Sequence, residues 1–254
     1  MMRNLIPALA IGACMSFAVQ KDKKLIPPGT VQISETFFAD ETEVSNMAWM
    51  EYESWTKTKF GANSAEHLST LPDTLVWREK NATNEPYVQH YYRHAAYRNY
   101  PVVGISYEQA VAFCKWRTER VKESLMLSRK KEYSITYRLP TKEEWELLSN
   151  NGTNIFPGNG KNEKGISKLN CMNPNDTASY AGANDITAPV YSYWQNRFGL
   201  FNTFGNVSEM VSEKGISKGG SWRHDLESCR AGKNIAYSKP EAWLGLRCVC
   251  VTGS

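Results

Sequence analysis

The stretch from Phe198 to Arg230 constrains the fold of this chain more than any other. It reads FGLFNTFGNVSEMVSEKGISKGGSWRHDLESCR and combines glycine turns, oxygen-bearing side chains, and a histidine and a cysteine close together. Glycine allows backbone conformations that other residues avoid, so such a loop can curl without regular structure. We therefore expect ordered loops here and, within them, any functional site.

Oxygen ligands are concentrated in the first part of this stretch. Asn202 and Glu209 lie seven residues apart, with Gly205 between them. An amide oxygen, a carboxylate and inward-turned carbonyls suit a hard cation such as calcium, in an irregular cage rather than an EF-hand loop. Taken alone, the pattern favours a surface turn whose polar side chains bond the local backbone.

His224 and Cys229 follow the Gly219-Gly220 turn. A thiolate and an imidazole can hold a soft metal such as copper, or they can form an activated nucleophile pair. The residues alone favour a third interpretation, in which a buried thiol lies near a solvated histidine.

The N-terminus is typical of an export signal covering residues 1–18. Arg3 precedes an apolar run from Leu5 to Met15, which is too short to span a membrane. Cleavage after Ala18 would release a soluble periplasmic protein. A lipobox ending at Cys14 would instead give a lipoprotein anchored in the outer membrane, and we prefer it because it gives that cysteine a role.

Composition and local signals then predict one α+β domain over residues 26–254, after a short linker at 19–25. The chain is 41% hydrophobic and 22% charged, and its net charge of +4 gives no support for nucleic-acid binding. Capping boxes at 106–109 and 141–144 start two helices, and another helix runs to about Thr56. Strands are expected at 31–38 (two short ones), 133–139, 188–194 and 244–251, with irregular segments at 61–100 and 150–187.

Export would place the remaining five cysteines in an oxidising compartment, where disulfides persist. The number five is odd, so at least one cysteine stays unpaired. They are Cys114, Cys171, Cys229, Cys248 and Cys250.

Seven motifs in order resemble the formylglycine-generating, sulfatase-modifying-factor family across about residues 26–251. They are IPPGT, ETEVSN, YPVVGISYEQAVAFCKW, YRLPTKEEWELLS, RFGLFNTFGNVSEM, KGGSW and GLRCV. This resemblance implies a variant of the C-type lectin fold with little regular secondary structure and long loops. The segment from LPDTLVWREK to CKWRTERV further resembles the gliding-motility lipoproteins of Bacteroidetes. This resemblance implies that the chain has a structural role in the periplasmic ring of the type IX secretion apparatus, with other envelope proteins as partners.

The resemblance also implies site residues, and it replaces the surface-turn interpretation with a calcium cage. The implied calcium ligands are Glu43, Asn202, Gly205, Val207 and Glu209. A second calcium site would fall near Asn170 and Asp185, although its spacing is disturbed. The family disulfide between the helix and the last strand would join Cys114 to Cys248.

The family's copper centre is where this chain departs from the pattern. Family enzymes hold copper between two thiolates, and the matching positions here are His224 and Cys229. Because one thiolate is missing, we expect a non-catalytic, calcium-stabilised envelope domain. The alternative is a copper-dependent oxidase that uses His224 and Cys229 to convert a cysteine of a sulfatase-type protein into formylglycine.

Overall fold

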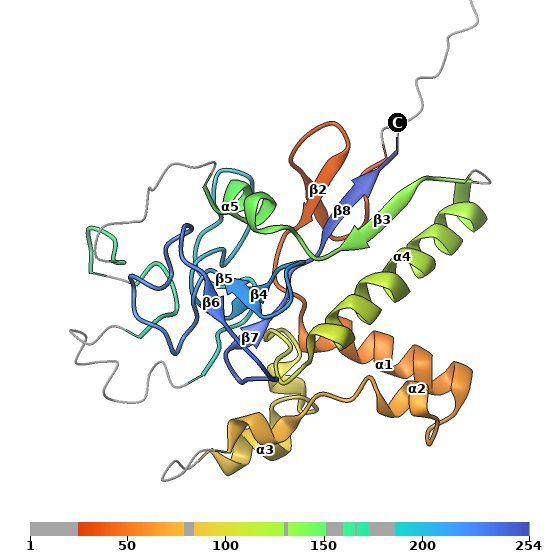
Figure 1. Cartoon of the computed structure of the whole chain (residues 1–254), viewed down its shortest axis with the longest axis horizontal. Coiled ribbons are helices and arrows are strands. Elements are labelled where there is room, and N and C mark those ends of the chain that lie inside the picture. The colour runs from red at the N-terminus through yellow and green to blue at the C-terminus, as the bar shows by residue number, and fades with distance from the viewer. Residues whose placement is uncertain are drawn as a thin grey trace, which may run out of the picture.

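The computed structural model describes residues 25–78, 84–129, 132–150, 160–165, 167–172 and 186–253. Two small sheets and a few helices are joined by long loops (Figure 1), which confirms the predicted α+β class with little regular secondary structure. The predicted export signal with Cys14, and Asp185 of the second calcium site, lie outside the described residues.

The first sheet is antiparallel and has the strand order β1-β2-β8-β3. β1 and β2 form a hairpin, as predicted for residues 31–38, and β3 confirms the strand predicted at 133–139. The bounds are Thr30–Gln32 for β1, Phe37–Asp40 for β2, Ile135–Arg138 for β3 and Val249–Thr252 for β8.

The second sheet has the order β6-β5-β4-β7, in which β4 and β7 run parallel. Its strands are β4 Ser208–Met210, β5 Ile216–Lys218, β6 Ile235–Ala236 and β7 Leu244–Gly245. The single strand predicted at 244–251 was wrong, because β7 and β8 belong to different sheets. Residues 246–248 cross between them, and the carbonyls of Leu246 and Cys248 accept hydrogen bonds from Val44 and Asp40, both at 2.9 Å.

The longer helices are α1 (Asn46–Phe60), α4 (Tyr107–Arg129) and α5 (Lys142–Asn150). Both predicted capping boxes form. The Ser106 N–H donates to Gln109 Oε1 at 2.7 Å, and the Thr141 N–H donates to Glu144 Oε2 at 2.9 Å. Each box satisfies amide groups that have no partner within the helix itself.

Short helices occupy much of the segment predicted to be irregular at 61–100. They are α2 (Ala65–Leu68), η1 (Thr74–Trp77), α3 (Glu85–His90) and η2 (Ala95–Tyr97). The side chains of Ser64 and Asp73 accept hydrogen bonds from the first turns of α2 and η1. Such local caps stabilise single helical turns that hydrophobic periodicity cannot reveal.

The strand predicted at 188–194 was also wrong, since the described residues 186–207 contain turns and bends. The Val190 N–H donates to Asn99 at 2.7 Å. The carbonyls of Ala188 and Val190 accept from the side-chain amides of Asn206 and Asn202. Because these partners are not neighbouring strands, the segment forms no ladder.

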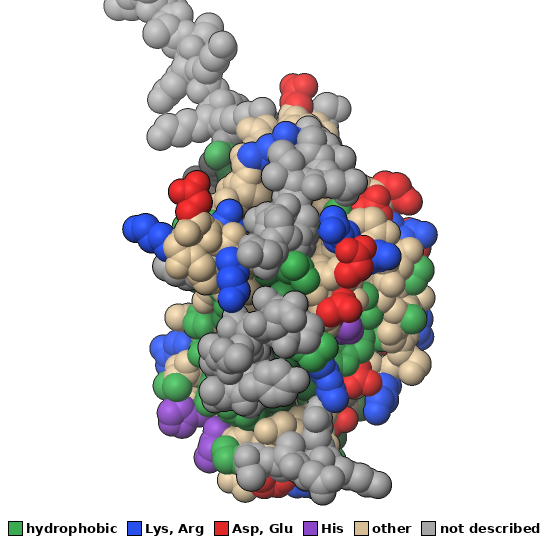
Figure 2. Space-filling view, turned by 90° about the vertical axis from the view of Figure 1, so that its left-hand side faces the viewer, with side chains coloured by type: hydrophobic (Ala, Val, Ile, Leu, Met, Phe, Trp, Pro, Cys, Tyr) green, Lys and Arg blue, Asp and Glu red, His purple; other side chains and the backbone are tan. Residues whose placement is uncertain are grey.

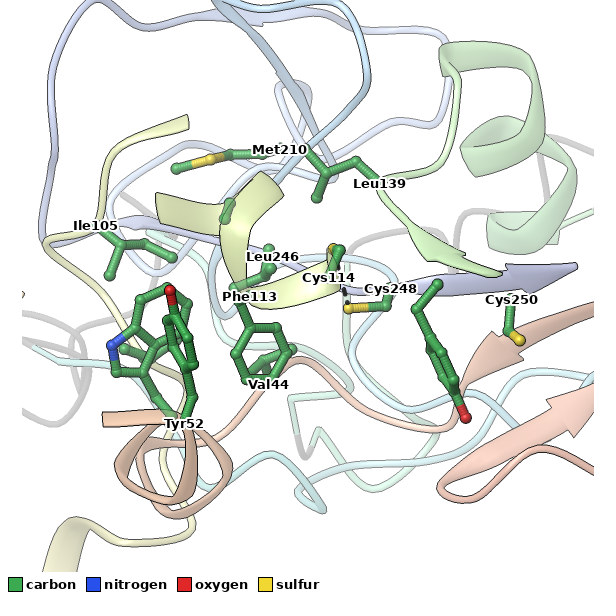
Figure 3. Packing of buried hydrophobic residues seen from close by; sticks show 14 of the residues in the cluster. Val44, Tyr52, Ile105, Phe113, Cys114, Leu139, Met210, Leu246, Cys248 and Cys250 are labelled. Carbon is green, nitrogen blue, oxygen red and sulfur yellow. Dashed lines mark hydrogen bonds between the residues drawn. The ribbon is translucent and has the colours of Figure 1, made fainter. Parts of the chain in front are cut away.

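The main core lies between α4, α1 and the two sheets. Trp49 of α1 stacks on Phe113 of α4 with ring centroids 5.2 Å apart. Figure 3 shows Cys114 of α4 directed toward Cys248, with Cys250 farther along β8.

Over the described part of the face in Figure 2, acidic and basic side chains are interspersed. Among the helices of the described ranges, the structure has none long and apolar enough to cross a membrane.

Candidate functional site: a buried carboxylate–amide cluster and a thiol pair

The loop leading into β4 is held by its own polar side chains. Asn196 Oδ1 accepts from the N–H groups of Phe198 and Leu200 at 2.9 and 3.2 Å. The Phe201 N–H donates to the Glu41 carbonyl at 2.9 Å, which ties this loop to the segment carrying Glu43. Two distant parts of the chain are thereby brought together.

Glu43 is the centre of this junction, with a side chain surrounded by protein. Its Oε2 accepts from Asn202 Nδ2 at 3.1 Å and its Oε1 from Asn206 Nδ2 at 2.8 Å. Asn202 and Asn206 both adopt positive φ angles, of 50° and 62°, a region that asparagine tolerates better than most residues. Burial raises the pKa of Glu43 to about 8.

Glu209 of β4 lies in the same cluster and meets a buried cation. Arg247 Nη2 donates to Glu209 Oε1 at 2.7 Å, and Trp145 Nε1 donates to Glu209 Oε2 at 2.7 Å. Arg247 also donates to the carbonyls of Asp40 and Phe201. Asn206, Arg247 and Trp145 were all missed from sequence. The signal for Arg247 was a lone charge inside the apolar GLRCV motif.

The cluster fits a hard cation in its chemistry and its charge. Asn202 Oδ1 is buried and has no hydrogen-bond partner, so a good oxygen ligand remains available. Two carboxylates facing one guanidinium leave a net negative charge when both are ionised. No group of three His, Cys, Asp or Glu side chains suited to a metal occurs in the described ranges. A cation here would therefore also need the amide oxygen and carbonyls.

The five implied calcium residues come from two places in the chain, and Glu43 and Asn202 are in direct hydrogen-bond contact. Glu43 follows β2, and the other four lie on the turn entering β4 and on β4 itself. A side chain at Gly205 would place its Cβ 2.4 Å from the Asn170 carbonyl oxygen, so only glycine fits this turn. Asn170, implied for the second calcium site, has a buried Oδ1 without a partner.

The cysteine end of the loop has a partner that sequence reasoning did not identify. Cys171 and Cys229 belong to one buried cluster, in which the Cys229 thiol donates to the Asp225 carbonyl at 3.4 Å. The neighbouring Cys171 thiol, together with burial, raises the pKa of Cys229 above that of an ordinary thiol, and the same interaction lowers the pKa of Cys171. The odd cysteine count was the available signal, and it did not indicate which residues meet.

His224, the other implied copper ligand, is held by different neighbours. Its Nδ1 lies 2.6 Å from Ser221 Oγ, and its ring meets Trp243 edge-on with centroids 4.8 Å apart. Burial lowers the pKa of His224. A copper pair of His224 and Cys229 stays a prediction, because the Cys229 thiol is buried and donates to the Asp225 carbonyl.

The implied disulfide partners lie close together in the core. The Cys114 and Cys248 sulfurs are 3.5 Å apart, with both thiols free. The structure thus supports the proximity of this pair, while the covalent bond stays a prediction.

Two small sheets, capped helices and a buried oxygen-rich junction between long loops define a loop-dominated α+β domain. A sequence model of the sulfatase-modifying factor enzyme 1-like domain matches residues 10–251. The chain therefore belongs to the FGE-sulfatase family.

Named relatives and a solved structure agree with this assignment. The mouse formylglycine-generating enzyme is 32% identical over 120 residues, which is 45% of this chain and 27% of the mouse protein. A formylglycine-generating enzyme of Streptomyces coelicolor is 28% identical over 211 residues, covering 74% of this chain and 60% of that protein. The crystal structure of CarF has a TM-score of 0.51 at 18% identity, covering 86% of this chain and 87% of that one. At that identity the likeness concerns the fold alone. The matches span about a quarter of the mouse protein and less than two thirds of the Streptomyces protein.

Proposed function

We propose that this chain is a calcium-stabilised, non-catalytic domain that serves as a structural part of a cell-envelope assembly. The state of Cys229 is the observation that carries this proposal. The residue is 0% exposed, and the neighbouring Cys171 thiol and burial raise the pKa of its thiol. The thiolate is the form that attacks substrates and binds metals, so a buried, protonated thiol is poorly suited to chemistry.

The calcium part of the proposal rests on the junction of Glu43, Asn202 and Glu209. The carboxylates and the unpartnered Asn202 Oδ1 would hold the ion, with the carbonyls of Gly205 and Val207 completing the set. Arg247 balances only one of the two carboxylate charges, and the bound ion would balance the other. Because the ligands come from loops, ion binding would stabilise the folded state over the unfolded chain.

Thermal melting with calcium and with EDTA tests this role. We expect EDTA to lower the melting temperature of the wild type, and Asn202→Ala to shrink the difference. The matched control is Asn162→Ala, because Asn162 is not one of the implied calcium residues and its Oδ1 accepts a local hydrogen bond from Lys164. Identical melting with and without calcium would remove the calcium proposal.

The alternative function is a copper-dependent formylglycine-generating oxidase. It is favoured by the names of the relatives and by the retained Gly219-Gly220 turn beside Cys229. The test combines copper(I) binding with conversion of a Cys-x-Pro-x-Arg peptide. Turnover that Cys229→Ala abolishes would replace the structural proposal with the enzymatic one. An absence of both copper binding and turnover would support the structural proposal.

The cellular setting is part of the same proposal. An export signal with a lipobox at Cys14 would anchor the chain to the outer membrane from the periplasm, and the gliding-type segment suggests envelope proteins of a secretion or motility assembly as partners. Mass spectrometry of the mature N-terminus and of co-purified proteins tests both. An N-terminus without lipid would argue against the anchor, and an absence of envelope proteins would argue against the assembly.

A further inference from the structure

The five described cysteines separate into two close pairs and one remaining residue. The Cys114 and Cys248 sulfurs lie 3.5 Å apart, and Cys171 and Cys229 pack together in one buried cluster. Cys250 lies in β8, where its thiol approaches the Val251 carbonyl. In the second pair, Cys229 is one of the implied copper positions, whereas Cys171 comes from a different loop and was not implied as a site residue.

The backbone holds the two loops of this pair side by side. The Met172 N–H donates to the His224 carbonyl at 2.9 Å, and Met172 pairs with Asp225 in a parallel bridge. Cys171 thus lies one residue before a point of attachment to the loop that carries Cys229. The two side chains are 6% and 0% exposed. The residues packed around them are Leu169, Phe204 and Leu226.

We propose that Cys171 and Cys229 form a disulfide in the mature protein, which cross-links the 167–172 segment to the loop at 221–230. The proposal rests on the proposed export, because an oxidising compartment is where such a bond persists. Each thiol gives up one proton and one electron as the S–S bond forms. An oxidised disulfide-exchange protein, or oxidised glutathione, takes up both protons and both electrons and becomes two thiols.

The cross-link has two consequences. It joins residues that are far apart in sequence, so it restricts the unfolded chain and stabilises the folded one. It also leaves Cys229 without a thiolate, so the oxidised protein cannot use this residue for copper binding or nucleophilic attack.

Peptide mapping without reduction tests the bond directly. The full chain, purified after export, is denatured and alkylated, then digested and analysed by mass spectrometry. We expect a cross-linked peptide joining Cys171 to Cys229, with Cys250 alkylated. Alkylation of both Cys171 and Cys229, persisting after refolding with oxidised glutathione, would overturn the proposal.

A double-mutant cycle provides a second, independent measurement. Cys171→Ala, Cys229→Ala and the double variant should each lower the melting temperature by roughly the same 5–10 °C, because either change breaks the same bond. Cys250→Ala is the matched control, and its effect should add to each of the others. Additive losses at Cys171 and Cys229 would contradict a shared bond.

The same samples separate this proposal from the calcium proposal. If the protein is cross-linked and melts identically with calcium and with EDTA, the disulfide proposal is supported and the calcium proposal is rejected. An EDTA-sensitive protein with alkylated Cys171 and Cys229 gives the opposite result and rejects the disulfide alone.

Discussion

Arg247 and Glu209 form an ion pair in the interior, with side chains 0% and 1% exposed and 2.7 Å between Nη2 and Oε1. Arg247 lies in the crossing between β7 and β8, and Glu209 lies on β4. The pair therefore joins the two sheets at the point where the last part of the chain passes from one to the other. It also places a fixed positive charge beside the Glu43 cluster.

Removing Arg247 tests how much this junction contributes to stability. We expect Arg247→Met to lower the free energy of unfolding by about 3–5 kcal/mol, because Glu209 is left as an uncompensated buried charge. Urea denaturation measures the loss. Arg78→Met is the matched control, since Arg78 pairs with Glu85 on the exposed surface. A loss no larger than that of the control would show that the pair is not buried in solution.

Asn206 organises the same region through its amide. It donates to Glu43 Oε1 and to the Ala188 carbonyl, while its Oδ1 accepts from the Ala188 N–H at 2.6 Å. We expect Asn206→Ala to destabilise the protein by about 3 kcal/mol, because several buried polar groups lose their partners. Asn206→Gly separates the effect of the positive φ angle from that of the lost hydrogen bonds. If urea denaturation shows neither variant to be destabilised, the network does not contribute as proposed.

Gly220 should not tolerate a side chain. A Cβ there would lie 2.4 Å from Cys229 Sγ, whereas at Gly165 it would meet nothing within 4 Å. Both residues have positive φ, at 67° and 76°, so Gly165→Ala controls for backbone strain. We expect Gly220→Ala to be less stable than Gly165→Ala by about 2 kcal/mol because of overpacking, as measured by thermal or urea unfolding. Equal stabilities would mean that the thiol loop moves freely away from Gly220.

Glu53 predicts a pH dependence away from the candidate site. Burial opposes ionisation of Glu53, but hydrogen bonds from Arg93 and Tyr92 outweigh it and lower its pKa, with His67 also in reach. This stabilisation is present above the ordinary glutamate pKa of 4.5 and is lost as pH falls through the lowered value.

Glu53→Gln should therefore be less stable than the wild type near neutral pH, with the difference shrinking in acid. Urea denaturation at several pH values measures this, and the exposed Glu66→Gln is the control. A difference that stayed constant across the acid range would assign the effect to packing rather than to ionisation.

Local signals in the sequence were sufficient for several elements. The boxes at Ser106 and Thr141 started helices as predicted, and the hairpin around residues 31–38 formed, because caps and turns depend on residues a few positions apart. The ordered motifs also led to the FGE-sulfatase family. Through that resemblance, Glu43 and Asn202 were named together, and the structure places them in hydrogen-bond contact.

Contacts between distant segments were decided only by the tertiary structure. The strand expected at 244–251 was divided because its middle residues bond the 40–44 segment, and Arg247 turns inward to Glu209. The segment expected to be a strand at 188–194 instead forms hydrogen bonds with asparagine side chains. Cys171 and Cys229, from two different loops, pack in one buried cluster. Local sequence pattern determines where a chain can turn or begin a helix. It does not determine which loops meet, because that depends on the packing of the whole chain.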